Sequence, residues 1–372
     1  MSFELKNIYS ISFFEQYLKD FNKVLPIISK KDFFSLIFND KWDSFELKQR
    51  MSHIAQTLTV LLPEKYDDAI ETIKEIITVH QKKGNNGFNF EYMFYPEFVI
   101  LNGQNHFKTS ISAMENITQF TSCEFAVRHF FQKDFNPMMK QMQEWTNHTH
   151  PYVRRLSSEG SRTRLPWAIK VPDLFKHPDK ILTLLEKLHN DENEWVRKSV
   201  ANNLNDLSKD FPEQVLQFTK QKLTHSNKNS VQLFKHANRT LLKKGNEKAL
   251  SFFGFNKNTQ IEVKSFTINN PKMVVVVGQN LEFELELKNT ENSNQQIRIE
   301  YLIHFLRKDG THFCKVFQWK QFFLGANESC QLKKFHSFKK ISTRNYASGT
   351  HFLSLQINGN ECFKSDFSLF DS

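Results

Sequence analysis

The sequence predicts a mostly α-helical chain whose C-terminal third forms an all-β sandwich. From residue 12 to about residue 250, apolar side chains recur every three or four positions, as in Met51-Ile54-Leu58. After about position 256 the pattern becomes an alternation with a period of two, as over residues 281–287. We therefore expect a helical domain at residues 1–255 and a β domain at residues 256–372.

A repeat organises the middle of the helical domain. The segment YVRR at 152–155 matches WVRK at 195–198, a spacing of 43 residues (195 minus 152). Partner helices are expected at 173–189 and 212–223, and a weaker third copy at 231–242. Helix pairs that repeat at this length are typical of HEAT or armadillo-like arrays, which stack into a slab with a concave face. The sequence thus predicts a HEAT-like α-solenoid.

The β domain is predicted from short strands separated by turn residues. Candidate strands cover 274–277, 281–287, 297–301 and 351–357, and turns are expected at 278–279, 308–310 and 358–360. About seven strands in roughly 110 residues are typical of an immunoglobulin-like sandwich.

Composition limits the partners and the compartment. The chain of 372 residues has a net charge of +10, which favours an anionic partner without identifying it. The four cysteines, none with C-x-x-C spacing, speak against a zinc site, and we expect no metal and no cofactor. With no signal pattern in MSFELKNIYS and no apolar run of membrane length, we expect a cytoplasmic monomer without membrane contact.

The segment SSEGSRTRLPWA at 157–168 has the most unusual local chemistry. A helix that starts near Tyr152 should end at Gly160, a residue suited to the left-handed cap. Glu159 would then lie in the last turn, where the helix dipole disfavours negative charge. Glu159 can instead be a solvated surface residue paired with Arg155. A local rule broken without visible compensation favours a functional interpretation.

Two further acids have a functional and a structural interpretation. Glu124 fits a capping box before a helix at 125–131, and Asp206 fits a polar helix end. Asp206 and Glu159, however, lie near the ends of helices in consecutive repeats. Because adjacent repeats stack, both side chains could point into one concave groove.

Two tryptophans are expected in contacts between repeats. Trp167 follows Pro166 in a poorly helical stretch, and burial is its plainer interpretation. Trp195 aligns with Tyr152 at a repeat position and is expected in the core.

Basic residues recur at repeat-related positions and predict a cationic stripe along the groove. Singly, each can be a solvated helix residue, but a stripe matches the phosphates of duplex DNA. Carboxylates within such a groove would weaken phosphate binding, so their presence favours catalysis on DNA. The predicted DNA-binding residues are Arg154, Arg155, Arg162, Arg164, Arg197, Lys198, Lys235 and Arg239, extended by Lys243 and Lys244.

The β domain carries a second basic cluster. It is either a set of solvated edge-strand residues or a second DNA clamp. Its members are Lys333, Lys334, Lys339, Lys340 and Arg344.

Together, HPYVRRL, SSEGSRTRLPWA and WVRKSVANNLND resemble the AlkC-type DNA alkylation-repair glycosylases, which are HEAT-like repeat proteins of the AlkD/AlkC superfamily. The resemblance is strongest over residues 120–210, and helical repeats followed by an immunoglobulin-like domain also fit the AlkC branch. One departure is Thr163, where proline is expected more often.

This resemblance implies an enzyme that hydrolyses the N-glycosidic bond of cationic N-alkylated bases, such as 3-methyladenine and 3-methylcytosine, in double-stranded DNA. It implies that Glu124, Glu159, Trp167 and Asp206 form the lesion site. Carboxylates near the sugar would stabilise an oxocarbenium-like transition state. It further implies that the base need not be flipped into a deep pocket. We see no lysine placed as a Schiff-base nucleophile, so we expect a monofunctional glycosylase.

Two alternatives remain open at the level of sequence. A non-catalytic HEAT-repeat scaffold that binds nucleic acid or protein would use the same basic repeats and β domain. An RNA-directed activity is a further alternative. The acids distinguish a scaffold from an enzyme. A scaffold can lose Glu159 and Asp206 with little loss of binding, whereas an enzyme should lose turnover.

Overall fold

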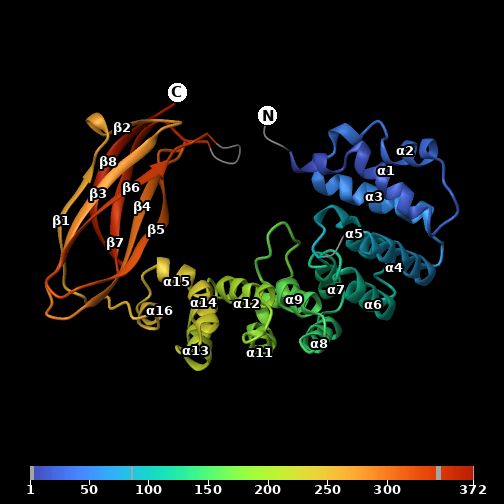
Figure 1. The fold of residues 1–372 in the computed structure, drawn as a ribbon, viewed down its shortest axis with the longest axis horizontal. Coiled ribbons are helices and arrows are strands. Elements are labelled where there is room, and N and C mark those ends of the chain that lie inside the picture. The colour runs from blue at the N-terminus through green and yellow to red at the C-terminus, as the bar shows by residue number, and fades with distance from the viewer. Residues whose placement is uncertain (1–3, 85–86, 341–344, 372) are drawn as a thin grey trace. The chain divides into compact units, whose positions relative to one another are not determined.

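The computed structural model of the chain describes residues 4–84, 87–340 and 345–371 (Figure 1). It divides into two compact units. The helical unit comprises the chain up to Phe211 together with residues 224–237, and the β unit comprises residues 212–223 together with the chain from Asn238 onward. Within the described residues, no helix is both long and apolar enough to cross a membrane.

The helical unit forms because each amphipathic helix buries an apolar stripe against its neighbours. In α1, for example, Ser10 caps the first turn, and Phe14, Tyr17 and Phe21 are buried. The short 3-10 helices are η1 (Leu5–Ile8), η2 (Trp42–Ser44) and η3 (Phe90–Tyr92). The α-helices are α1 (Ile11–Phe21), α2 (Lys30–Ile37), α3 (Leu47–Leu61), α4 (Tyr66–Lys82), α5 (Phe94–Asn102), α6 (Phe107–Ile117), α7 (Ala126–Lys133), α8 (Phe135–Trp145), α9 (Pro151–Gly160), α10 (Pro172–Lys176), α11 (Pro178–Leu188), α12 (Glu194–Leu207) and α14 (Lys228–Ala237).

The sequence repeat appears as a repeated hydrogen-bond pattern at the starts of α9 and α12. An N-cap side chain, from His150 or Asn193, accepts the amide proton of the second helical residue. The Nη1 atoms of Arg154 and Arg197 each donate to the carbonyls six and five residues earlier. Equivalent positions therefore make equivalent contacts, whereas the HEAT-like classification stays a prediction.

Gly160 ends α9, but not as a left-handed cap. It is helical, and the following Ser161 has a φ of −88°. A Cβ atom at Gly160 would lie 2.4 Å from Cγ2 of Val127 in α7 and 3.0 Å from Cε of Met142 in α8. The predicted cap is thus wrong, and the glycine instead permits close helix packing.

The β unit contains two sheets (Figure 1). One has the strand order β1-β3-β6 and the other β2-β8-β7-β4-β5, in which β2 pairs parallel to β8. The unit also contains α13 (Pro212–Lys222), α15 (Arg239–Lys243), α16 (Glu247–Ser251) and η4 (Pro271–Met273). The strands are β1 (Ile261–Ile268), β2 (Val274–Val276), β3 (Asn280–Asn289), β4 (Gln295–Leu306), β5 (His312–Leu324), β6 (Ser329–Ser337), β7 (Gly349–Ile357) and β8 (Asn360–Phe370).

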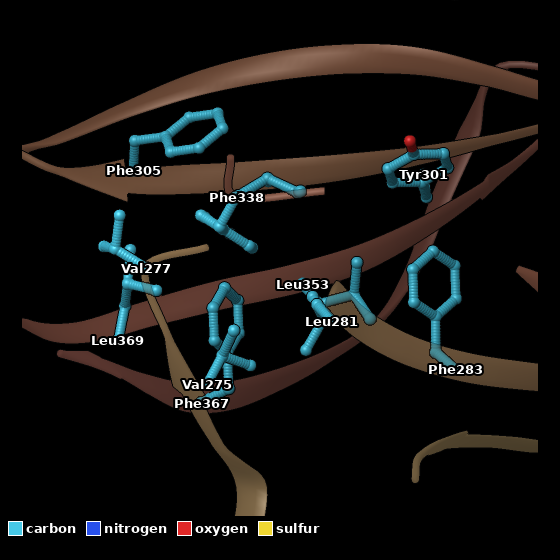
Figure 2. Packing of buried hydrophobic residues seen from close by; sticks show 11 residues of the cluster. Val275, Val277, Leu281, Phe283, Tyr301, Phe305, Phe338, Leu353, Phe367 and Leu369 are labelled. Carbon is cyan, nitrogen blue, oxygen red and sulfur yellow. The ribbon is translucent and has the colours of Figure 1, made fainter. Parts of the chain in front are cut away.

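The core of the β unit lies between the sheets. Phe283 on β3 packs within one buried cluster with Tyr301 on β4, Leu353 on β7 and Phe367 on β8 (Figure 2). Along β3, buried residues alternate with exposed or half-buried ones, as a strand with one buried face requires. The predicted change from helix to strand after about residue 256 is confirmed, because β1 follows α16 directly.

A tight turn joins β7 to β8 and packs against helical residues of the same unit. Asn358 and Gly359 have φ values of 43° and 83°, as a two-residue hairpin turn requires. A Cβ atom at Gly245, between α15 and α16, would lie 2.4 Å from the carbonyl oxygen of Gly359. The expected boundary at 255/256 falls between α16 and β1, whereas the compact β unit also takes in α13, α15 and α16.

All four cysteines lie in described parts of the chain, and all four are free thiols.

Candidate active site

Arg162 joins two acids from consecutive repeats. Its Nη1 donates to Oε1 of Glu159 at 2.6 Å, and its Nε donates to Oδ2 of Asp206 at 2.8 Å. Glu159 lies in the last turn of α9 and Asp206 in the last turn of α12. The sequence-based expectation that these two acids lie near each other in space agrees with this geometry.

The three side chains are buried, and their charges are compensated locally. Glu159, Arg162 and Asp206 are 5%, 8% and 2% exposed. Ser199 Oγ donates to Oε2 of Glu159 at 2.6 Å, and Lys209 Nζ donates to Oδ1 of Asp206 at 3.1 Å. Burial alone would lower the pKa of Arg162, but the two carboxylates outweigh it and raise that pKa, so the guanidinium stays charged.

Glu124 extends this group toward the surface. Its Oε2 accepts from Ser122 Oγ at 2.7 Å and from Nη2 of Arg155 at 3.2 Å, and Arg155 Nη2 lies 3.9 Å from Oε2 of Glu159. The predicted capping box is wrong, because Phe125 is the N-cap of α7 and no side chain caps it. We call the alternating series Glu124–Arg155–Glu159–Arg162–Asp206 the acid row.

One face of α12 supports the acid row. Ser199, Asn203 and Asp206 follow each other at helical spacings of four and three, which puts them on one side of the helix. Ser199 and Asp206 contact the row, and Asn203 Nδ2 donates to the carbonyl of Ser158 in α9 at 2.8 Å. The sequence analysis missed Ser199 and Asn203, although three small polar residues on a core-facing helix stripe were a usable signal.

Arg128 holds the segment that follows α9. It is only 1% exposed, and it donates to the carbonyls of Gly160, Arg162 and Ile169 at 3.1, 2.7 and 2.7 Å. Burial, together with the charge of Arg162, lowers its pKa to about 10. No sequence signal pointed to Arg128, since its partners lie 32, 34 and 41 residues further along the chain.

Trp167 is presented to solvent from a strained backbone. Its side chain is 62% exposed, and its φ of 64° lies in the left-handed region that bulky residues rarely adopt. Its carbonyl accepts a hydrogen bond from Lys48 of α3. The buried interpretation of Trp167 is wrong, and so is that of Trp195, which is 55% exposed.

Three of the predicted DNA-binding arginines are engaged within the protein. Arg154 pairs with Asp191 through Nε and Nη2 at 2.6 and 3.0 Å, and Arg197 donates to backbone carbonyls. Arg164 makes a bidentate pair with Asp210 at the surface. From the predicted basic set, Arg155 and Arg162 belong to the acid row.

The other predicted basic residues lie elsewhere in the fold. Lys198 in α12 holds its Nζ 5.8 Å from the ring centroid of Trp195. Lys235 lies in α14, and Arg239 is the first residue of α15.

In the β unit, Lys333 on β6 has an 82% exposed side chain that lies 3.6 Å from Glu284, and Lys340 lies 3.3 Å from Asp371. Arg344 of the predicted cluster lies outside the described residues.

The acid row can hold positive charge at a fixed place. Fixed, oriented carboxylates stabilise a cation without reorganising at the moment of reaction. Among the residues that the structure describes, no three His, Cys, Asp or Glu side chains gather in a way that could hold a metal ion.

Comparisons with known proteins cover nearly the whole chain. The family described as "DNA alkylation repair enzyme" matches residues 106–241, which include the acid row and Trp167. The family described as "Uncharacterised protein YhaZ, C-terminal Ig-like domain" matches residues 262–371. The uncharacterized protein YhaZ of Bacillus subtilis is 36% identical over 98% of this chain and 99% of its own length.

A solved structure agrees with the sequence comparisons. It is that of the Pseudomonas fluorescens alkylpurine DNA glycosylase AlkC bound to DNA containing an abasic site analog. The likeness has a TM-score of 0.91 and 28% identity, and it covers 98% of this chain and 99% of the other. The immunoglobulin-like character of the β sandwich is confirmed by the match of residues 262–371.

Proposed function

This chain belongs to the AlkC-type family of DNA alkylation-repair proteins, which includes YhaZ of Bacillus subtilis, and we propose that it is a DNA glycosylase. It excises cationic N-alkylated bases, with 3-methyladenine and 3-methylcytosine as the expected substrates, from double-stranded DNA. The bond that breaks joins the base to the sugar, and water supplies the new hydroxyl group. The protein acts as a cytoplasmic monomer.

The acid row is the observation that carries this proposal. A cationic base is already a good leaving group, so the reaction needs stabilisation of the sugar more than it needs a general acid. As the bond lengthens, the sugar gains oxocarbenium character, which nearby carboxylates stabilise. Glu124, whose side chain is 17% exposed, is the most accessible acid of the row and can also orient the attacking water.

Arg162 positions the acids in this proposal. Its guanidinium donates to Glu159 and Asp206, so a phosphate would have to displace a buried carboxylate to reach it. This differs from the phosphate contact expected for Arg162 from the sequence. Arg155, with 19% of its side chain exposed, is better placed to meet DNA while keeping Glu124 and Glu159 in line.

Trp167 supplies an exposed aromatic face for the lesion. A π-face attracts a cation most strongly when water is excluded from the contact. Because its backbone is fixed away from the common regions, the ring can meet an unstacked base without a deep pocket.

Base release from methylated duplex DNA tests the proposal. Wild-type protein should free 3-methyladenine or 3-methylcytosine, detected by chromatography, and Glu159→Gln should lower the rate by about 100-fold or more. Glu192→Gln is a matched control, since the Glu192 side chain is 89% exposed and faces Arg154 rather than the acid row. If well-folded, DNA-binding wild type frees no base, the glycosylase proposal is wrong.

We propose a monofunctional reaction, without cleavage of the DNA backbone and without a metal or organic cofactor. Borohydride should therefore trap no covalent protein–DNA adduct during turnover. A trapped adduct would instead indicate a Schiff base formed by an amine of the protein.

The basic cluster of the β unit is proposed as a second DNA contact. Lys333→Gln, at an exposed position of β6, should weaken DNA affinity and reduce the slope of log Kd against log salt by about 1, for one lost phosphate contact. An unchanged salt slope would argue against the clamp.

A non-catalytic scaffold is the competing function. It predicts that Glu159→Gln and Asp206→Asn leave DNA affinity nearly unchanged and that the wild type releases no base. The continuation of the acid row to the partly exposed Glu124 and the strained, exposed Trp167 disfavour it, because neither feature has an evident structural benefit.

A further inference from the structure

The loop that carries Trp167 is anchored at both of its ends. Arg128 donates to the carbonyls of Arg162 and Ile169, one on each side of the tryptophan. Gln132 Nε2 donates to the carbonyl of Lys170 at 2.8 Å. These contacts fix where the loop begins and ends, but none of them reaches its exposed tip.

The tip has a separate anchor from a distant part of the chain. Lys48 in α3 donates from Nζ to the carbonyl of Trp167, 119 residues away. The same Nζ lies 4.8 Å from the centroid of the Phe125 ring, next to Glu124 of the acid row. Lys48 is an exposed residue, so its position is set by these two contacts rather than by burial.

The backbone at Trp167 needs such an anchor. A bulky residue with a positive φ persists only where its surroundings impose that conformation. Its own side chain is 62% exposed and cannot supply the restraint by packing. A hydrogen bond to its carbonyl acts directly on the strained peptide unit.

The loop also has space into which it could relax. A cavity of about 150 Å³ is lined by Ala168 and Ile169 of the loop and by Phe125, His129 and Lys48. Without the contact from Lys48, the tip is free to move toward this cavity and take Trp167 out of its exposed position.

We propose that Lys48 is a positioning residue, which holds Trp167 ready for the alkylated base. This inference rests on the glycosylase proposal for its effect on catalysis. It also gives the N-terminal helices a role, because α3 supplies Lys48. The positive charge of Lys48 strengthens its hydrogen bond to the carbonyl of Trp167 and its contact with the ring of Phe125.

A double-mutant cycle tests the coupling. Lys48→Met keeps the length of the side chain without its donor, and it should lower single-turnover excision by about tenfold, whereas Lys48→Arg should retain most of the rate. In the background of Trp167→Ala, Lys48→Met should have little further effect, because the group that it positions is absent. Additive effects of the two substitutions would overturn the proposal.

Salt dependence separates positioning from a simple phosphate contact. If Lys48 acted on a phosphate, Lys48→Met would reduce the slope of log Kd against log salt by about 1. We expect an unchanged slope, and a reduced slope with an unchanged excision rate at saturating DNA would overturn the proposal. The control is Lys31→Met, which removes an exposed lysine of α2 and should change neither quantity.

Fluorescence of the protein alone keeps the test independent of activity. The contribution of Trp167 is the difference in emission between the wild type and Trp167→Phe. The quenching of this Trp167 emission by acrylamide should differ from the wild-type value in Lys48→Met and return to it in Lys48→Arg. If the wild type releases no base but this quenching changes, the glycosylase proposal is wrong, whereas the proposal that Lys48 positions Trp167 is supported. Unchanged quenching would overturn the proposal that Lys48 positions Trp167.

Discussion

The helical unit and the β unit each bury an arginine against a carboxylate, but the two sites differ in stoichiometry and surroundings. In the β unit, Arg298 and Glu300 form one closed pair, with side chains 3% and 0% exposed. The second oxygen of Glu300 accepts from Gln356 at 2.7 Å. In the helical unit, Arg162 serves two acids, and the row continues to the partly exposed Glu124.

The difference shows that burial of charge does not by itself indicate function. A one-to-one buried ion pair needs only a structural explanation. The acid row instead links ion pairs from several elements and continues to the partly exposed Glu124, and the same part of the chain carries the strained, exposed Trp167. These added features have no evident structural benefit, and they are what distinguishes a candidate active site.

The largest expected difference between the acid row and the Arg298–Glu300 pair is in their effect on catalysis. Glu159→Gln should lower excision by about 100-fold or more, because it removes a fixed charge from the reacting sugar. Glu300→Gln should leave the excision rate per folded molecule unchanged. Single-turnover rates, normalised to the folded fraction from circular dichroism, measure both. Equal losses in the two variants would mean that the acid row has no special role.

The free energy of unfolding should respond in the opposite order, with a larger loss for Glu300→Gln than for Glu159→Gln. Glu300→Gln leaves Arg298 buried without its partner and should cost about 3–5 kcal/mol of unfolding free energy. Glu159→Gln should cost less, about 1–3 kcal/mol, since Arg162 keeps its pair with Asp206. Urea unfolding measures both values. A large loss for Glu159→Gln would indicate that the row serves the fold.

Packing next to the row should give a smaller effect. Gly160→Ala puts a methyl group 2.4 Å from Cγ2 of Val127, which should cost about 1–3 kcal/mol. The double variant Gly160→Ala with Val127→Ala should recover part of this loss, because it removes the clashing atom. Unfolding by urea is again the measurement. If the second substitution gave no recovery, the close approach of α7 and α9 would not be the cause.

Outside the acid row, the buried His80 of α4 should affect only the pH dependence of stability. Burial lowers the pKa of His80 from 6.5 to about 4, although Asp20 acts against this shift. The unfolded chain therefore binds a proton that the folded chain resists, and stability should fall as pH decreases from 6.5 to about 4.

His80→Gln should flatten this part of the stability profile and leave stability at neutral pH and the excision rate nearly unchanged. Asp20 does not mimic the effect, because its pKa is lowered from 3.8 and its contribution is lost only at lower pH. An equally steep profile in the variant would contradict the assignment.

The sequence predicted the pairing of distant elements where a repeat made them equivalent. The spacing of 43 residues placed Glu159 and Asp206 on consecutive repeats, and Arg162 lies between them in the chain. The alternating pattern after residue 256 likewise predicted strands and the glycine turns between them. Both signals are local or periodic, and periodicity survives in a single sequence.

Contacts without periodicity could not be predicted. Lys48 and Arg128 act on backbone carbonyls far along the chain, and a carbonyl carries no residue-specific signal. The conformation of Trp167 depends on those contacts, so its exposure was predicted wrongly. Gly160 was misinterpreted for a related reason, since close packing and a left-handed cap both favour glycine.

The contact between Gly245 and Gly359 has a consequence for exchanging domains between relatives. Two backbones meet there with no room for a methyl group on either side. A chimaera spliced at the helix-to-strand border would replace one of these surfaces but not the other. A cassette that begins between α14 and α15 would transfer both glycines together and would leave α14 with the helical unit, so we expect recombination between homologous genes to succeed at that earlier position.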